Sequence, residues 1–143
     1  MTRKFEDLTT ATGVLLEREL EAHRRNLSES AQIAGELAQI DAMRQAAQAD
    51  QGAINARQIL GADTLWQGWL VSKRAEILRR SAMARAREAD SLARARTAFS
   101  RAEAAKSLAQ ADKDAARKRR LQSEAETIEM LGVLREGRAR GYD

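Results

Sequence analysis

The absence of proline from all 143 residues is the feature that most limits what this chain can fold into. Proline interrupts helices more strongly than any other residue, so a chain without it can form very long ones. Between residues 63 and 140 the only glycines are Gly68, Gly132 and Gly137. The sequence therefore predicts a helix of about 75 residues there, roughly 110 Å long at ~1.5 Å per residue.

A helix of that length needs a second helix beside it, and residues 1–60 are the natural partner. Gly61 is a good residue for ending the first helix, and Asp63 and Thr64 are good N-caps for the next; Gly52 is a competing break. We expect an all-α fold, a single antiparallel coiled-coil hairpin with a longer second helix. The expected boundaries are a first helix at about 3–59, a turn at about 60–63 and a second helix at about 64–137.

The composition favours a thin seam between two helices over a globular core. Alanine occupies 29 positions, whereas aromatic residues make up 3% of the chain. Apolar spacing predicts two seam stripes. The first helix contributes Leu16, Leu20, His23, Leu27, Ala34 and Leu37, and the second contributes a seven-residue ladder of Leu78, Leu92 and Phe99, interrupted by Arg85 and Lys106. Aligning the helices at 61–63 places residue 16 near residue 108.

Charge and cysteine content indicate where the protein is located and what kind of partner it binds. There is no cysteine, no signal-peptide pattern and no apolar run near the ~18 residues of a membrane span, so we expect a cytoplasmic, soluble protein. Residues 1–62 carry 7 Lys/Arg and 9 Asp/Glu, a net charge of −2, whereas residues 63–143 carry 18 and 12, a net charge of +6. The basic second helix leaves positive charge for a partner.

No motif for catalysis or cofactor binding is present. His23 is the only histidine, so it cannot form a metal site with other His or Cys residues, and we interpret it as a seam residue. There is no Gly-rich phosphate loop and no Ser/His/Asp set. We expect a protein that is not an enzyme, with no cofactor, metal or small-molecule substrate.

Three features of the second helix are candidate partner-binding elements. The apolar stripe from Leu121 to Leu134 overhangs the first helix, with only Phe5, Leu8 and Val14 to cover it, which indicates an interface, homodimerisation or a frayed end. Trp66, Trp69 and Leu70 share a predicted face beside Lys73, and they form either a binding hot spot or a cap on Ile54, Ile59 and Leu60. The cationic run is Arg117, Lys118, Arg119 and Arg120. It surrounds the helix, so we expect it to bind an acidic protein or to remain in contact with solvent, rather than to bind nucleic acid.

This plan resembles the flagellar export protein FliJ family and the related rods of type III secretion injectisomes. The residues that carry the resemblance are Trp66, Trp69 and Leu70 at the start of the second helix, and the segment 115–129 (AARKRRLQSEAETIE). The resemblance covers nearly the whole chain, although its alanine content is a departure from the family.

The resemblance implies a coiled-coil stalk similar to the gamma subunit of rotary ATPases, with a role in flagellar biogenesis, chemotaxis and type III protein export. It implies binding to the export ATPase ring, the export gate membrane protein and export chaperones, at the cytoplasmic face of the inner membrane. The ring-binding residues would be Phe5, Leu8, Arg117, Lys118, Leu121, Ile128, Leu131 and Arg135. The gate-facing residues would be Trp66, Trp69, Leu70, Lys73 and Ile77.

Three other functions remain open from the sequence. A phasin-like coat of a granule or membrane surface would need a broader apolar face than the predicted seam. A scaffolding or structural coiled coil would self-assemble without an ATPase. A nucleic-acid binder would use the basic second helix and lose affinity steeply with salt.

Overall fold

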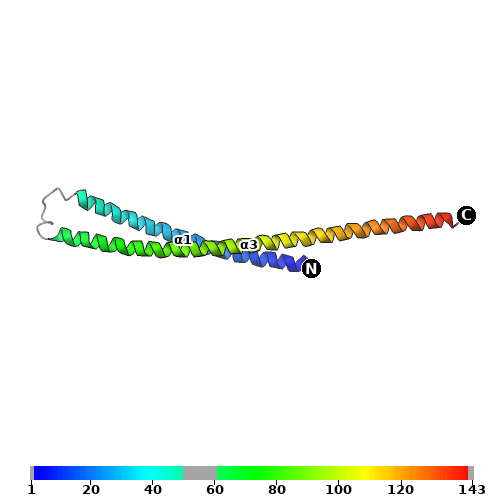
Figure 1. Ribbon diagram of the computed structural model, residues 1–143, viewed down its shortest axis with the longest axis horizontal. Coiled ribbons are helices and arrows are strands. Elements are labelled where there is room, and N and C mark those ends of the chain that lie inside the picture. Colours follow the sequence, from blue (N-terminus) through cyan, green and yellow to red (C-terminus); the bar gives the residue numbers. More distant parts are fainter. Residues whose placement is uncertain (1, 50–60, 142–143) are drawn as a thin grey trace. The chain divides into compact units, whose positions relative to one another are not determined.

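The computed structural model describes residues 2–49 and 61–141, and this part of the chain forms two helices and no strand. Helix α1 spans Thr2–Ala49 and helix α3 spans Ala62–Arg140. The two helices run antiparallel and pack against each other (Figure 1). The predicted all-α hairpin with a longer second helix is therefore confirmed.

Gly61 begins the second helix. Its φ of 73° is in the left-handed region, which glycine adopts without steric cost. Its carbonyl oxygen accepts a hydrogen bond from Leu65 N–H at 3.3 Å, so Gly61 is the N-cap of α3 in place of the predicted Asp63 or Thr64. Asp63 lies in the first turn, where its negative charge favours the helix dipole. The predicted end of the first helix, over residues 50–59, lies outside the described residues.

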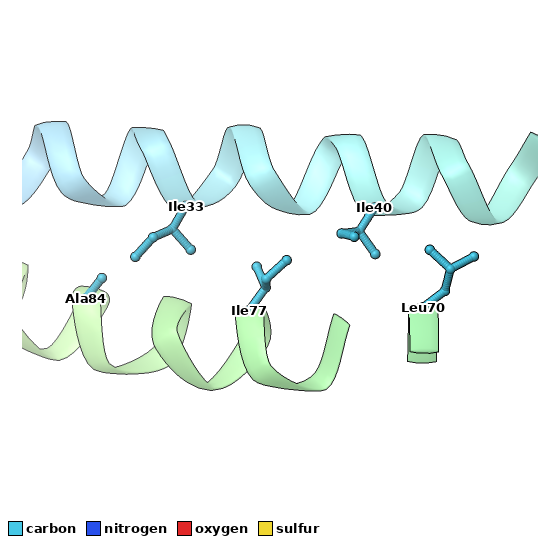
Figure 2. Close-up of a cluster of buried hydrophobic side chains, with 5 residues drawn as sticks. All are labelled: Ile33, Ile40, Leu70, Ile77 and Ala84. Atoms are coloured by element: carbon cyan, nitrogen blue, oxygen red, sulfur yellow. The ribbon is translucent and has the colours of Figure 1, made fainter. Parts of the chain in front are cut away.

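The chain divides into two compact units, and each contains part of both helices. Unit 2, Leu16–Thr97, has a core of Ile33 and Ile40 from α1 and Leu70, Ile77 and Ala84 from α3 (Figure 2). Unit 1 consists of Met1–Leu15 and Ala98–Asp143. Its buried residues are Ala98, Ala102 and Ala105, so its seam is formed by small side chains.

The seam of α3 follows a strict seven-residue repeat, as in a coiled coil. The buried residues of this row are Leu70, Ile77, Ala84, Ser91, Ala98 and Ala105. The predicted ladder, one residue later along the chain, is wrong because Leu78, Leu92 and Phe99 are all exposed, Leu78 at 41%. In the core of unit 2, Ile33 lies between Ala84 and Ile77, and Ile40 lies between Ile77 and Leu70 (Figure 2). These contacts place the row of Ile77 in the seam.

Ion pairs between the helices show the register of unit 2. Arg80 Nη1 lies 2.6 Å from Glu36 Oε2, and Arg74 Nε lies 2.8 Å from Asp41 Oδ1. The predicted alignment put residue 36 level with residue 88, so it was wrong by eight residues.

His23 is a seam residue, as predicted. It is half-buried, and its Nδ1 lies 2.7 Å from Oγ of Ser91 on α3. The Ser91 hydroxyl donates to the carbonyl oxygen of Glu88 at 3.0 Å. Because the hydroxyl proton of Ser91 is used in that bond, the hydroxyl oxygen accepts a hydrogen bond from Nδ1–H of His23. Both polar side chains therefore have a hydrogen-bond partner inside the seam.

Candidate partner-binding surfaces

The two tryptophans form an exposed, stacked pair at the start of α3. The ring centroids of Trp66 and Trp69 are 5.2 Å apart with an interplanar angle of 13°. They are 44% and 48% exposed, so each indole keeps about half of its surface in contact with water. A rigid aromatic pair of this kind is typical of a binding hot spot. The alternative cap residues, Ile54, Ile59 and Leu60, lie outside the described residues.

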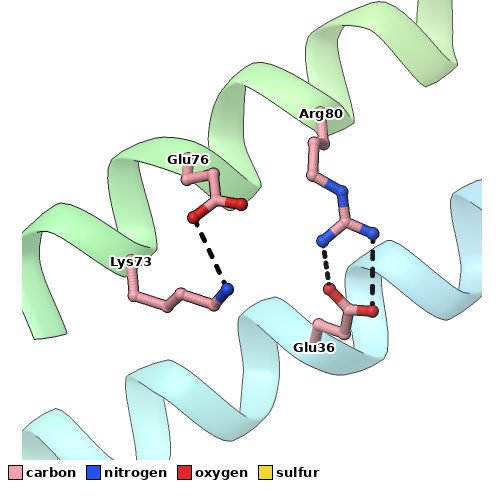
Figure 3. A network of polar contacts seen from close by, with 4 residues as sticks. All are labelled: Glu36, Lys73, Glu76 and Arg80. Carbon is pink, nitrogen blue, oxygen red and sulfur yellow. Dashed lines mark hydrogen bonds and ion pairs between the residues drawn. The ribbon is translucent and has the colours of Figure 1, made fainter.

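The rest of the predicted gate-facing patch does not share that surface. Leu70 and Ile77 are each 1% exposed and belong to the core of unit 2, so neither is accessible to a partner beside the tryptophans (Figure 2). Leu70 is the seam residue that α1 covers, and the side chains of Trp66 and Trp69 lie outside that contact. Lys73 is half-buried and its Nζ lies 3.5 Å from Oε2 of Glu76 (Figure 3). The tryptophan pair is therefore the accessible part of this patch.

The distal part of α3 has no covered side. Every side chain from residue 113 to residue 141 is exposed, including the predicted ring-binding residues Leu121, Ile128, Leu131 and Arg135. Ile128 is 69% exposed. Of the residues expected to cover this stripe, Leu8 and Val14 are exposed and Phe5 is half-buried. The predicted overhang therefore exists, and it includes the whole stripe from Leu121 to Leu134.

The cationic run is part of the same uncovered stretch. Arg117, Lys118, Arg119 and Arg120 are all exposed, and successive residues are rotated by about 100° around the helix. Among the described residues, one weak ion pair involves this run, between Arg120 Nε and Glu124 Oε1 at 3.9 Å. The run therefore surrounds the helix with positive charge, as expected.

The two sides of the hairpin in unit 2 differ in chemistry. Arg80 and Arg87 bind Glu36 and Glu29 along one side, with distances of 2.6 and 3.0 Å between Nη1 and the carboxylate oxygen. The hydrogen bond that Arg80 donates to Glu36 and the negative charge of Glu36 raise the pKa of Arg80 above its ordinary value (Figure 3). We call this edge the charged side.

The opposite edge is richer in apolar side chains, although it also carries the ion pair of Arg74 with Asp41. Relative to Ile77, Arg80 is rotated by about −60° and Leu78 by about +100°, so they lie on opposite sides of the seam. The same rotation applies on α1 to Glu36 and Ala34 relative to Ile33. We define the apolar side as the exposed apolar residues of this edge, which are Leu27, Ala31, Ala34 and Ala38 of α1 and Val71, Ala75, Leu78, Ala82, Ala89 and Leu92 of α3. The exposed Arg85 lies among them.

Shallow depressions follow the apolar side. One is lined by Arg44, Val71, Arg74, Ala75 and Leu78, and another by Arg85, Glu88, Ala89 and Leu92. Sequence analysis missed this surface. The signal was present, because the ladder of Leu78 and Leu92 assigned to the seam belongs to the apolar side.

A metal-binding cluster is absent from the described parts of both helices. Within residues 2–49 and 61–141, no group of three or more His, Cys, Asp or Glu side chains could hold a metal ion. Neither described helix has a stretch that is long and apolar enough to cross a bilayer. No protein-family profile, no curated protein and no solved structure matches the chain.

Proposed function

We propose that this chain is a non-enzymatic stalk and escort component of a flagellar type III protein export apparatus. The proposal joins the FliJ resemblance to the architecture of an antiparallel hairpin whose second helix is longer than the first. In it, the chain binds the export ATPase ring, the export gate and export chaperones at the cytoplasmic face of the inner membrane. The hairpin acts as a structural element between these partners, and the ATPase performs the hydrolysis.

The observation that carries the proposal is the uncovered distal part of α3. Leu121, Ile128 and Leu131 are exposed on a helix that has no partner along this stretch. Each large aliphatic side chain that a partner covers contributes about 1.5–3 kcal/mol. A ring that encloses a single helix would cover all sides of it, which suits apolar and cationic side chains distributed around the helix.

The start of α1 and the distal part of α3, which both belong to unit 1, would bind the ring together. Leu8 is exposed and Phe5 is half-buried at the start of α1, and both were expected to bind the ring with the distal segment. Arg117 and Lys118 provide charge for an acidic rim around an apolar entrance. Long-range attraction of this kind mainly raises the association rate.

The gate contact is restricted to Trp66 and Trp69. Their stacked indoles are accessible, whereas Leu70 and Ile77 are buried in the seam. In the proposal, the gate membrane protein covers the tryptophan pair, and Lys73 lies at the rim of that contact. Leu70 and Ile77 then hold the hairpin together beneath it.

A pull-down of the purified full chain with the flagellar export ATPase of the same host tests the ring contact. We expect the wild-type chain to bind, and the double variant Leu121→Ser with Ile128→Ser to bind at least about tenfold more weakly, which corresponds to ~1.4 kcal/mol. The matched control is Val14→Ser with Leu15→Ser, which changes two other exposed apolar residues. Absence of wild-type binding at low and moderate salt would contradict the proposal.

A further inference from the structure

The apolar side of unit 2 contains an arginine without a partner. Arg85 lies at the middle of the row formed by Leu78 and Leu92, and neither an ion pair nor a hydrogen bond joins it to any described residue. Arg74 of the same edge is paired with Asp41 of α1, and Arg80 and Arg87 of the charged side are also paired with α1. An exposed apolar surface around one unpaired cation is complementary to an apolar helix that carries carboxylates.

The distal segment of α3 has that composition. From Leu121 to Leu134 it contains Glu124, Glu126 and Glu129 and no Lys or Arg. Its six large apolar residues are exposed on several sides of the helix, and they are Leu121, Ile128, Met130, Leu131, Val133 and Leu134. A helix that is apolar on several sides is stable in water only when another surface covers it.

The segment fits the length of the apolar side. Fourteen residues of helix, from Leu121 to Leu134, extend about 21 Å. Val71 and Leu92 are separated by 21 residues, or about 32 Å, along α3. The alanines between them allow a third helix to approach closely, because small side chains reduce the distance between helix axes.

This contact cannot form within one chain. Helix α3 is continuous from Ala62 to Arg140, so the distal segment would have to break the helix to return to its own apolar side. Breaking a helix of good helix formers loses its hydrogen bonds and requires a new turn, for which this segment offers only Gly132. The complementary surface must belong to another molecule.

We propose that Leu121–Leu134 of one chain docks on the apolar side of a second copy of the chain. The leucines and alanines of that side cover Ile128, Leu131 and their neighbours, and Arg85 pairs with the glutamates. The chain therefore supplies both complementary surfaces itself. This inference does not rest on the proposed export function, although both use Leu121 and Ile128, so binding of an ATPase would compete with self-association.

Two full-chain variants with opposite charge changes test the contact in sedimentation-velocity experiments. Arg85→Glu alters the apolar side only, and the triple variant Glu124→Lys, Glu126→Lys and Glu129→Lys alters the distal segment only. We expect the wild-type chain to form dimers, and each variant alone to associate at least about tenfold more weakly. A 1:1 mixture of the two variants regains dimers, because one chain has an intact apolar side and the other an intact segment.

The controls separate this contact from a general effect of charge or folding. Arg101→Glu makes the same charge change elsewhere on α3, and its self-association should equal that of the wild type. Leu78→Gln removes an exposed apolar contact without changing charge, and it should weaken dimer formation as Arg85→Glu does. Circular dichroism should show that its helicity is unchanged. A wild-type chain that is monomeric up to about 1 mM overturns the proposal. Failure of the mixture to regain dimers also overturns it.

Discussion

Arg80 and Glu36 face each other across the hairpin with Nη1 and Oε2 2.6 Å apart (Figure 3). This pair lies beside the seam in which the large apolar residues of both helices pack, among them Ile40 and Leu70. Leu78 and Leu92 lie on the other side of that seam and are exposed. The register that the pair marks therefore shows which surface is core and which is available to a partner.

Ile77 and Leu78 provide the sharpest test of the seam. Ile77 is buried and Leu78 is exposed, so Ile77→Ala should lower the free energy of unfolding by about 2–4 kcal/mol, whereas Leu78→Ala should lower it by less than about 1 kcal/mol. Urea unfolding followed by circular dichroism measures both. Equal losses of stability, or a larger loss for Leu78→Ala, would show that the row of Leu78 forms the seam and would contradict the assignment of Ile77 to it.

The exposed ion pair of Glu36 and Arg80 should contribute little stability. Both side chains are partly exposed, so replacing Glu36 by Gln should cost about 0.2–1 kcal/mol at low salt, and less at high salt because of screening. Thermal unfolding at two salt concentrations measures this. Arg101→Gln is the control, since no ion pair joins Arg101 to another described residue. A salt-independent cost above 2 kcal/mol would conflict with a surface pair.

The hydrogen bond between His23 and Ser91 should have a measurable effect on stability. Ser91 is 5% exposed, and Ser91→Ala leaves the Nδ1 donor of His23 without its partner. We expect a loss of about 1 kcal/mol, and little further loss when His23→Ala is added, because the two residues share one interaction. Additive effects in the double-mutant cycle would show that the two side chains are not coupled.

The tryptophan pair should bind a partner without supporting the fold. Trp66→Ala with Trp69→Ala should leave most of the helicity intact, because both indoles are about half exposed and lie outside the core of unit 2. Circular dichroism checks the helicity, and acrylamide quenching of single-tryptophan variants checks exposure. A large loss of helicity would instead assign the pair to a cap of the hairpin.

The cationic run should affect binding and leave folding unchanged. Reversing the charges of Arg117, Lys118, Arg119 and Arg120 should weaken the binding of an acidic partner, mainly because association becomes slower. The helicity measured by circular dichroism should not change. Stopped-flow or surface-based kinetics at two salt concentrations measures the association rate. Unchanged kinetics would remove this run from the partner-binding surface.

The helical hairpin could be predicted from the sequence, but its seam could not. The lack of proline and the caps near Gly61 determine that the chain forms two helices. The rows containing Ile77 and Leu78 both repeat every seven residues with apolar members, so spacing alone does not distinguish core from surface. The interhelical contacts of Ile33, Ile40 and Glu36 distinguish the two rows, and contacts between helices cannot be deduced from the spacing within one helix.

The candidate binding surfaces could also be predicted only in part from the sequence. The exposure of Leu121 and Ile128 follows from the unequal lengths of the two helices, which the sequence indicated. The separation of Trp66 and Trp69 from Leu70 depends on the direction from which α1 approaches, and adjacent positions on a helix do not reveal it. The apolar side was missed because its leucines were assigned to the seam.

The ATP hydrolysis rate of the cognate flagellar export ATPase, measured with increasing amounts of this chain, tests the stalk proposal most directly. A stalk that enters the ring should raise the rate with the wild-type chain and with Val14→Ser/Leu15→Ser. The variant Leu121→Ser/Ile128→Ser should leave the rate at its basal value. An unchanged rate with the wild-type chain, or equal stimulation by the Leu121→Ser/Ile128→Ser variant, would contradict the account.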